Sequence, residues 1–502
     1  MREHARMTDP PGAPWWRDAV VYQVYPRAFQ DSGSDGEGDL RGIAARLDHI
    51  RDLGADALWL SPVYPSPMAD GGYDVAGYED IDPRFGTLAD ADALIAAAHE
   101  RGLKLLMDVV PCHTSIEHPW FRAHPERYVW ADGDAPPNNW RAAFGGPAWS
   151  RDPVSGRWYL HSFYPEQPDL NWRREDVRAA VGAALRFWRR RGVDGFRLDA
   201  IDRLMKDPQL RDDPPATAPP ALPEQREDGM LEHVHSRSAA DIGIALEALR
   251  RAVGDETLLV GEVYLPAARL APYLAYVDCA FAFELLHAPW EAAAFRSAIE
   301  AALDPGGAAG RVAWVLSNHD FPRLPDRVGA RNARAAALLA LTLPGAVFVY
   351  QGDEIGMADG PGGDPPHDRA GRDRHRHPMR WDDDAPHGGF TAAAAEPWLP
   401  AIEVDGGGVA QQAADADSVL SLYRDLIAQR RELGSGLEFV DGVADGVLAY
   451  RRGDRHIVAL NMSDEPRPAP PAGAVVRATH AVPAGARAPA QLRPGMAFLA
   501  EI

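Results

Sequence analysis

The feature that most constrains the fold is a repeated alternation of short apolar segments with helix-like stretches. Eight segments have the length and composition of buried strands: Val20–Pro26, Ala57–Pro62, Leu103–Val110, Gly195–Ala200, Leu258–Val263, Asp278–Leu285, Val312–Asp320 and Ala346–Glu354. Stretches rich in Ala, Leu and Arg separate most of them: Leu40–Leu53, Leu88–Arg101, Arg174–Arg190, Ala239–Val253 and Arg331–Leu343. Because such alternation favours parallel strands joined by right-handed crossovers, eight units predict an α/β fold closed into a (β/α)₈ TIM barrel. A doubly wound open sheet is the alternative, but no Gly-x-Gly-x-x-Gly follows the first strand.

Two parts of the chain depart from this alternation. Residues 111–173 contain PPNNWRAAFGGPAW and no clear helix, which predicts a loop-rich subdomain inserted after the third strand. From Leu437 onward, short strand-like pieces separated by Gly, Pro and Asp predict a C-terminal antiparallel β domain. The expected organisation is a catalytic barrel at 1–110 and 174–436, an inserted subdomain at 111–173 and a β domain at 437–502.

Charge and composition narrow the class of partner. The formal net charge of −21 disfavours nucleic acid and anionic membranes as partners. The chain has no run of 18 apolar residues and no signal-peptide pattern, so no membrane span is expected. Two cysteines exclude a disulfide framework, which favours a cytoplasmic location. We expect a monomer or a homodimer that binds a small molecule.

Acidic side chains stand where the predicted strands end. In GFRLDA, Arg197 and Asp199 share one face of a strand, while LLVGEV ends near Glu262 and WVLSNHD ends at Asp320. In a barrel these ends form one active-site face. Buried carboxylates persist only where they are paired or used, and Arg197 is expected to keep Asp199 ionised. Carboxylates with divided acid and base roles are typical of glycoside hydrolysis.

These motifs, together with DVVPCHTS, QPDLNW, YQGDEIGM and HPMRWDD, resemble the α-amylase superfamily, glycoside hydrolase family thirteen, in its α-glucosidase and oligo-1,6-glucosidase branch. The resemblance covers nearly the whole chain. It implies that Asp199 is the nucleophile, that Glu262 is the general acid and then the general base, and that Asp320 grips the sugar hydroxyls. It implies retention of the anomeric configuration and no cofactor for the chemistry; a retaining site needs its two carboxyl groups about 5–5.5 Å apart.

The resemblance also implies a pocket for one terminal glucose ring. Tyr73 is implied as its stacking platform and Asp74 as the ligand of its outer hydroxyls. Further contacts are implied for His113, Arg197, His319, Arg323 and Phe163, the last as a wall toward the aglycone. Simple core packing is the alternative for Tyr73 and Phe163.

The substrate is less constrained than the reaction. By resemblance, the small residue Ala200 after the nucleophile favours short α-1,4-linked glucosides such as maltose over α-1,6-linked ones. A sucrose-active hydrolase, an isomerase or an α-glucosyltransferase is the alternative with the same site, decided by the loops at Asp207–Gly229 and Gly360–His377. A non-catalytic transporter-associated subunit is an alternative of another class, which the presence of all three carboxylates disfavours.

One further site is predicted from spacing. In DSGSDGEGDL, side chains with oxygen atoms recur at every second position, at Asp31, Asp35, Glu37 and Asp39. Hard cations prefer such ligands, so this loop predicts a structural Ca²⁺ or Mg²⁺. By resemblance, the ligand at Glu37 is its backbone carbonyl, and Gly33 stands where a side-chain ligand is usual. An acidic flexible turn is the alternative.

Overall fold

The computed structural model describes residues 14–217, 228–237, 240–304, 311–434, 436–480 and 482–502. The predicted helix start at Ala239, and residues 218–227 of the predicted loop at Asp207–Gly229, lie outside this set.

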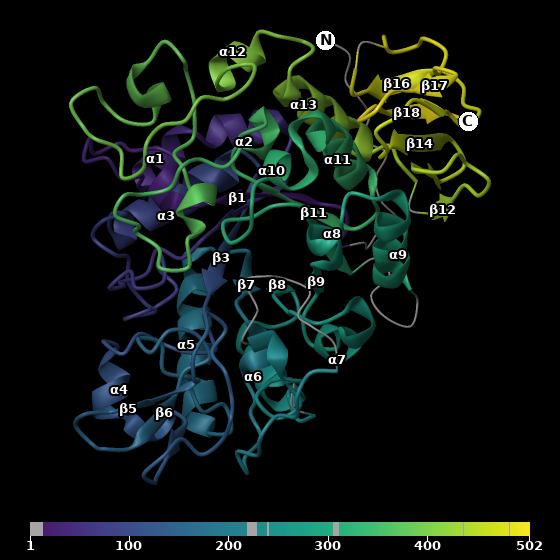
Figure 1. The fold of residues 1–502 in the computed structure, drawn as a ribbon. Helices are drawn as coiled ribbons and strands as arrows, with labels where there is room; N and C mark the ends of the chain where they lie inside the picture. The colour runs from purple at the N-terminus through teal and green to yellow at the C-terminus, as the bar shows by residue number, and fades with distance from the viewer. Residues whose placement is uncertain (1–13, 218–227, 238–239, 305–310, 435, 481) are drawn as a thin grey trace.

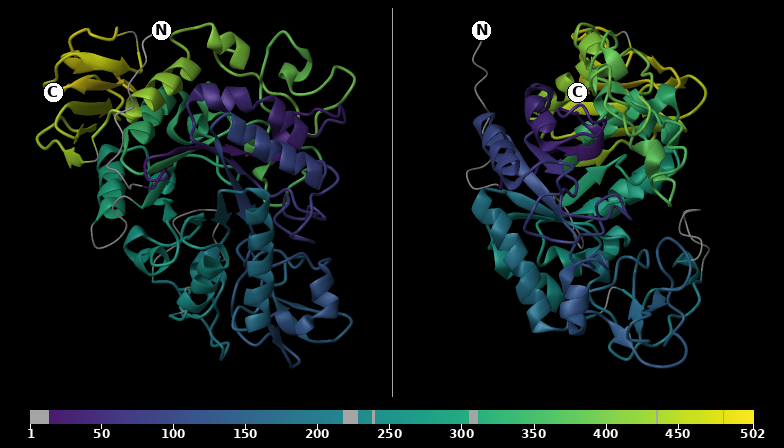
Figure 2. Two further views of the ribbon diagram at one scale, coloured as in Figure 1. Left: turned by 180° about the vertical axis from the view of Figure 1, so that it is seen from behind. Right: turned by 90° about the vertical axis from the view of Figure 1, so that its left-hand side faces the viewer.

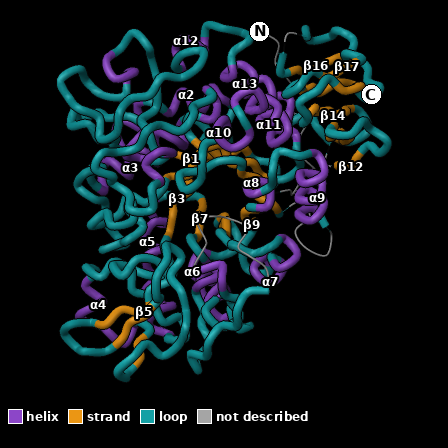
Figure 3. Tube along the Cα trace, in the orientation of Figure 1, coloured by secondary structure: helices purple, strands orange, loops and turns teal. Residues whose placement is uncertain are grey.

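Eight parallel strands form a closed barrel. They are β1 (Val20–Val24), β2 (Ala57–Leu60), β3 (Lys104–Val109), β7 (Gly195–Leu198), β8 (Leu258–Gly261), β9 (Cys279–Ala282), β10 (Val312–Val315) and β11 (Ala346–Tyr350). β1 pairs with both β2 and β11, so Tyr22 lies opposite Leu58 on one side and Val349 on the other. The predicted (β/α)₈ barrel is therefore confirmed, and the open sheet is excluded. Figure 3 shows the strands at the centre, surrounded by helices and loops.

Alternate side chains of each strand point into the barrel or out to the helices. On β1, Val21 belongs to the interior cluster, whereas Tyr22 packs with the helices. Trp59, Phe281 and Phe348 fill the interior, with ring centroids 4.8–5.9 Å apart. Because the interior is packed, polar chemistry is confined to the barrel ends.

The helices follow the expected order, with bounds set by local signals. They are α1 (Leu40–Ala45), α2 (Leu47–Leu53), α3 (Leu88–Glu100), α5 (Glu175–Arg191), α6 (Gly243–Val253), α7 (Ala271–Leu274), α8 (Glu284–His287), α9 (Ala292–Leu303), α10 (Leu324–Val328), α11 (Ala330–Thr342), α12 (Val409–Ala413) and α13 (Val419–Arg430). α3 begins with a capping box between Thr87 and Asp90, and α5 ends at Gly192, whose φ of 107° suits glycine. The single helix expected over Leu40–Leu53 is instead divided at Arg46.

The inserted segment is more ordered than its sequence indicates. It contains a helix, α4 (Pro119–Ala123), and an antiparallel sheet of β4 (Trp130–Ala131), β6 (Trp158–Leu160) and β5 (Trp149–Arg151). The expectation of no clear helix is therefore wrong. His118 caps α4 by accepting from the Trp120 amide, and Pro119 suits its first turn. Figure 1 shows this segment and the C-terminal sheet on opposite sides of the barrel.

The C-terminal part is antiparallel, as predicted. Its strands are β12 (Leu437–Phe439), β13 (Val447–Arg452), β14 (His456–Asn461), β15 (Arg467–Pro468), β16 (Val475–Ala478), β17 (Gln491–Leu492) and β18 (Ala497–Glu501). Five of them form one sheet in the order β12-β13-β14-β18-β16. The Tyr450 hydroxyl lies 2.6 Å from Thr342 Oγ1 of α11, which joins this sheet to the barrel. Figure 2 shows the C-terminal sheet, in yellow, beside the barrel. The residue boundaries of the three predicted parts stay predictions. Among the described residues, no helix is both long and apolar enough to cross a membrane.

Candidate active site

Two of the predicted catalytic carboxylates share one guanidinium at the ends of neighbouring strands. Asp199 follows β7 and Glu262 follows β8, which are paired in the barrel. Arg197 Nη1 donates to Asp199 Oδ1 at 2.6 Å, and its Nη2 pairs with Glu262 Oε1. The Ala200 amide donates to Glu262 Oε2 at 3.1 Å. Both carboxyl groups are thus held side by side at the C-terminal end of the barrel.

Asp108, at the end of β3, is a third carboxylate on the same arginine. Its oxygens lie 2.9 and 3.1 Å from Arg197 Nη1. It also accepts from the Tyr73 hydroxyl at 2.9 Å and from Trp59 Nε1 at 3.2 Å. Burial raises the pKa of Asp108 to about 7, against the opposing charge of Arg197. The residue therefore holds Arg197 and Tyr73 in position.

The protonation of Asp199 differs from the expectation that Arg197 keeps it ionised. Burial raises the pKa of Asp199 well above its usual range despite Arg197, and the charges of Glu262 and Asp108 add to this effect. The physical reason is that three buried carboxylates share one guanidinium. Because Asp199 and Glu262 both contact Arg197, the charge of Glu262 is close enough to favour a proton on Asp199. Such mutual influence between two carboxyl groups suits divided acid and base roles.

Asp320 has the opposite environment, although it follows a nearby strand, β10. It accepts from Arg372 Nη1 at 2.9 Å and from Arg376 Nη2 at 3.0 Å, and His319 Nε2 lies 3.3 Å from its Oδ2. Burial would raise the pKa of Asp320, but nearby positive charge, including that of Arg372 and Arg376, outweighs it and holds the pKa well below its usual range. Its side chain is 19% exposed, which makes it an ionised acceptor open to a ligand.

Aromatic and histidine side chains surround these acids. The rings of Tyr73 and His319 are stacked 5.3 Å apart with an interplanar angle of 8°. Arg197 lies 5.6 Å from the Tyr73 ring centroid. His113 Nε2 lies 3.2 Å from the Tyr73 carbonyl oxygen, and the Phe163 ring is 5.1 Å from the His113 ring. The structure therefore brings these predicted residues to the carboxylates.

The Asp74 carboxylate bonds within its own turn. Its Oδ1 accepts from the Ser66 hydroxyl at 2.9 Å and the Asp70 amide at 3.0 Å, and its Oδ2 accepts from the Ala69 amide at 2.8 Å. The acid of this turn that reaches the site is Asp70, which pairs with Arg372. Asp70 directly precedes the GGY segment and Asp74 directly follows it. Sequence reasoning missed Asp70 because nothing in this local order distinguishes the two aspartates.

Arg323 makes its contacts with other residues than Asp320. Its Nη1 donates to the Gln351 carbonyl oxygen at 2.9 Å, and its guanidinium lies 4.6 Å from the Tyr350 ring centroid. The arginines that do reach Asp320 belong to the predicted loop at Gly360–His377. The run RDRHR was the available signal, but such a run is usually a solvated surface, so it did not indicate a site.

The predicted metal loop uses its carboxylates internally. Asp31 accepts from the amides of Ser34 and Gly36 and from the Thr391 hydroxyl at 2.5–2.8 Å. Three further acids are engaged in the same way: Asp35 by the Glu37 amide, Glu37 by Arg27, and Asp39 by Ser32 and the Gly42 amide. The loop therefore does not fit a cation without replacing these contacts, and we derive no role for one in the chemistry.

Structural binding of Ca²⁺ or Mg²⁺ by this loop stays a prediction. It requires that EDTA lowers the melting temperature and that adding back Ca²⁺ or Mg²⁺ restores it, because a ligand that binds only the folded state stabilises it. The measurement is thermal unfolding followed by circular dichroism. Asp31→Asn is the matched variant, which must abolish the difference. An unchanged melting temperature would favour the acidic turn.

Within the described part of the chain, one group of acidic, histidine and cysteine donors converges: Cys112, His113 and Asp169 lie within 4.8 Å of one another. The Lys206 ammonium group lies among these three side chains. It pairs with Asp169 and lies 3.8 Å from Cys112 Sγ. Because a buried cation already neutralises the carboxylate, the group does not fit a metal site.

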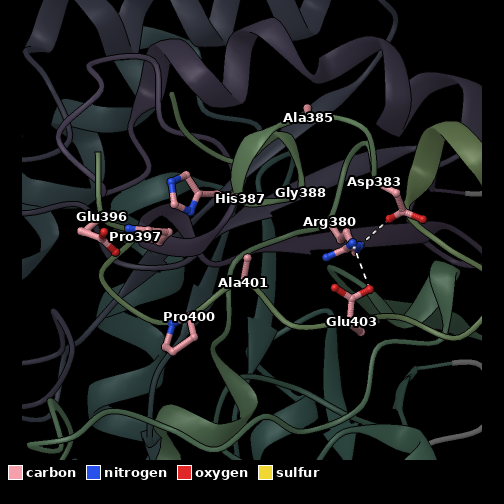
Figure 4. Close-up of a pocket in the computed structure, with 10 residues that line it drawn as sticks. All are labelled: Arg380, Asp383, Ala385, His387, Gly388, Glu396, Pro397, Pro400, Ala401 and Glu403. Atoms are coloured by element: carbon pink, nitrogen blue, oxygen red, sulfur yellow. Dashed lines mark hydrogen bonds and ion pairs between the residues drawn. The ribbon is translucent and has the colours of Figure 1, made fainter. Parts of the chain in front are cut away.

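Residues of the segment between β11 and α12 line a separate cavity of about 460 Å³ (Figure 4). Arg380 pairs there with Asp383 and Glu403, and none of the predicted site residues lines it. It is not the place where the carboxylates meet.

The fold and the site together place the chain among the (β/α)₈-barrel enzymes. A family model described as the catalytic domain of alpha amylase matches residues 23–436. The chain belongs to the alpha-amylase family, glycoside hydrolase family thirteen.

Curated relatives and solved structures agree with this assignment. A probable alpha-glucosidase of Rhizobium meliloti is 42% identical over 91% of this chain and 90% of its own length. An oligo-1,6-glucosidase of Parageobacillus thermoglucosidasius is 35% identical over 83% of this chain and 84% of its own. Among solved structures, the alpha-glucosyl transfer enzyme XgtA superposes with a TM-score of 0.88 at 36% identity, covering 97% of this chain and 99% of its own. The trehalulose synthase MutB of Pseudomonas mesoacidophila has a TM-score of 0.84 at 31% identity, covering 98% and 100%.

Proposed function

We propose that this protein is a retaining, exo-acting α-glucosidase that hydrolyses short α-glucosides through a covalent glucosyl-enzyme intermediate. The observation that carries the proposal is the shared guanidinium of Arg197, which holds the carboxyl groups of Asp199 and Glu262 together at one barrel end. Carboxyl groups this close suit a nucleophile and an acid, whereas inversion needs a wider gap for water. The named activities of the relatives support the same reaction.

The reaction has two steps. In the first, an Asp199 oxygen bonds to the anomeric carbon as the glycosidic bond breaks, and the proton carried by Glu262 passes to the leaving oxygen. This mechanism requires a proton on Glu262 when the substrate is bound, with Asp199 charged and nucleophilic. In the second step, Glu262 removes a proton from water, whose oxygen attacks the anomeric carbon and releases Asp199. Two inversions give net retention.

The remaining residues bind and orient the sugar in this proposal. Asp320 is held ionised by Arg372 and Arg376, so it accepts hydrogen bonds from sugar hydroxyls. Tyr73 is fixed by its bond to Asp108 and provides a flat face for the ring. Phe163, which packs against Arg203 with 5.1 Å between guanidinium and ring centroid, forms the wall toward the aglycone.

Glucosyl transfer is a second candidate that uses the same intermediate. It is favoured by the likeness to a glucosyl transfer enzyme and a trehalulose synthase. The outcome depends on whether water or a sugar reaches the intermediate first. Product analysis with maltose, isomaltose, sucrose, trehalose and longer maltodextrins separates the two: free glucose alone supports hydrolysis, and new disaccharides support transfer. Absence of turnover on the whole panel would contradict both.

The Ala200→Val change tests the proposed α-1,4 preference. We expect the ratio of maltose to isomaltose hydrolysis to fall. The structure adds a cost, because Ala200 has φ 44° and ψ 44° and its amide bonds to Glu262. A β-branched side chain is strained in this left-handed conformation, by roughly 1–3 kcal/mol. We therefore also expect a lower melting temperature and a lower overall rate.

Ala200→Ser is the matched control, because it adds one atom without β-branching. If the linkage ratio does not change in Ala200→Val, the α-1,4 assignment made from this residue is wrong. The cytoplasmic location and the monomeric or homodimeric state expected from the sequence stay predictions.

A further inference from the structure

Both histidines of the site contact a glutamine carboxamide. Gln167 Nε2 lies 2.9 Å from His113 Nε2, and Gln23 Nε2 lies 2.8 Å from His319 Nδ1. In each ring the other nitrogen is buried and, among the described residues, has no hydrogen-bond partner. The free nitrogens are Nδ1 of His113 and Nε2 of His319.

The orientation of the Gln167 carboxamide follows from its other contacts. Its Oε1 accepts from the Tyr164 amide at 3.0 Å, and its Nε2 donates to Asp70 Oδ2 at 2.8 Å. A flipped amide would set its NH₂ group against the Tyr164 N–H and its oxygen against a carboxylate. Both contacts would be repulsive, so the NH₂ group must face His113.

One competing acceptor lies near His113. The Tyr73 carbonyl oxygen is 3.2 Å from Nε2 and would favour a proton on that nitrogen. Gln167 is closer, and one of its two N–H groups already serves Asp70, so its second N–H needs the lone pair of His113 Nε2. A proton on Nε2 would set two donors against each other. Burial lowers the pKa of His113 to about 4, so the neutral ring carries its single proton on Nδ1.

The contact of His319 involves the other ring nitrogen. A donor from Gln23 to Nδ1 leaves the proton of the neutral ring on Nε2, which lies 3.3 Å from Asp320 Oδ2. Burial lowers the pKa of His319 to about 3, which agrees with a neutral ring. The two neutral rings are thus expected to carry their protons on different nitrogens, His113 on Nδ1 and His319 on the Nε2 that faces Asp320.

We propose that Gln167 and Gln23 are positioning residues that hold His113 as its Nδ1–H tautomer and His319 as its Nε2–H tautomer, so that each ring presents a ready N–H donor to the sugar. The identity of the ligand as a sugar rests on the proposed function, whereas the tautomers are a property of the free protein. A donor set in advance needs no proton rearrangement when a hydroxyl oxygen arrives.

The tautomers are tested without substrate, by nitrogen NMR of full-length protein labelled at histidine. His113→Asn and His319→Asn assign the two signals. We expect His113 in the unchanged protein to carry its proton on Nδ1. Gln167→Glu replaces the donor by an acceptor of the same shape, so the proton is expected on Nε2. Gln167→Met leaves only the Tyr73 carbonyl and is expected to give the same result if Gln167→Glu does not fold.

Gln23→Met is the matched control, because it removes a contact of His319 and is expected to leave the proton of His113 on Nδ1. The proposal is overturned if the unchanged protein already has the proton on His113 Nε2, or if neither Gln167 variant moves it. Since no substrate is present, this result does not depend on the enzyme being a glucosidase.

A kinetic measurement tests the role in binding. The substrates are maltosides that each lack one hydroxyl of the non-reducing glucose. The unchanged enzyme is expected to discriminate against the one that lacks the hydroxyl accepting from His113. In Gln167→Met we expect that discrimination to fall by roughly tenfold, the size of one lost hydrogen bond, with KM for maltose raised more than kcat is lowered. Equal loss on every analogue would indicate a merely structural role. No turnover of maltose by the unchanged enzyme would instead contradict the proposed function.

Discussion

Asp199→Asn is expected to reduce turnover of maltose by at least about 10³-fold, because an amide cannot form the covalent intermediate. The melting temperature is expected to stay the same or rise. Asp199 shares Arg197 with Asp108 and Glu262, and removing one of three buried acids relieves their repulsion. Steady-state kinetics with thermal unfolding on the same preparation separates loss of chemistry from loss of fold.

The matched control is Asp278→Asn. Asp278 precedes β9 at the opposite end of the barrel and pairs with Arg250 at 2.6 Å. Because that end of a barrel contributes stability rather than chemistry, we expect its activity to stay within about twofold and its melting temperature to fall. Near-normal activity of Asp199→Asn would refute the nucleophile assignment. A slow fluorinated glucosyl substrate should label a peptide that contains Asp199, detected by mass spectrometry.

Glu262→Gln is expected to lose about 10²–10⁴-fold on maltose, the usual contribution of a general acid. The loss in forming the intermediate should be much smaller on a nitrophenyl α-glucoside, because a nitrophenolate leaves without a proton. Azide should accelerate the second step, since it attacks the anomeric carbon without needing a general base. The comparison of two leaving groups in one variant is therefore a direct measurement of the acid role.

Asp199→Asn is the control for this experiment. It must lose activity on both substrates alike, because the nucleophile is needed whatever the leaving group. If Glu262→Gln lost activity equally on both, or if azide had no effect, Glu262 would not be the acid and base. The Tyr264 hydroxyl lies 3.3 Å from Glu262 Oε1. If Tyr264→Phe also lost more activity on maltose than on the nitrophenyl glucoside, this contact would support the acid role of Glu262.

The order of elements was accessible from sequence because periodicity records burial. All eight predicted strands are present, and their C-terminal ends were shortened by one to five residues where the chain leaves the barrel. The convergence of Asp199 and Glu262 followed from parallel pairing, since parallel strands end at the same edge. The break at Arg46 had no such signal, because both halves of Leu40–Leu53 continue the same apolar pattern.

Long loops carried no comparable signal. Arg372 and Arg376 reach Asp320 from a segment without periodicity, so neither their direction nor their partner was predictable. Asp70 and Asp74 are equivalent by composition, and only the path of the turn decides that Asp70 meets Arg372. The glutamine contacts of His113 and His319 likewise join residues 54 and 296 positions apart.

The amino-acid order alone therefore determined the barrel, its antiparallel C-terminal sheet and the strand ends that bear the acids, because apolar spacing is a local property of the chain. Tertiary structure alone decided which charges meet and in which direction each pKa shifts. The pKa of Asp199 is raised among the three carboxylates on Arg197, whereas that of Asp320 is lowered beside two arginines. Burial and distance, which no local pattern records, set these electrostatic energies.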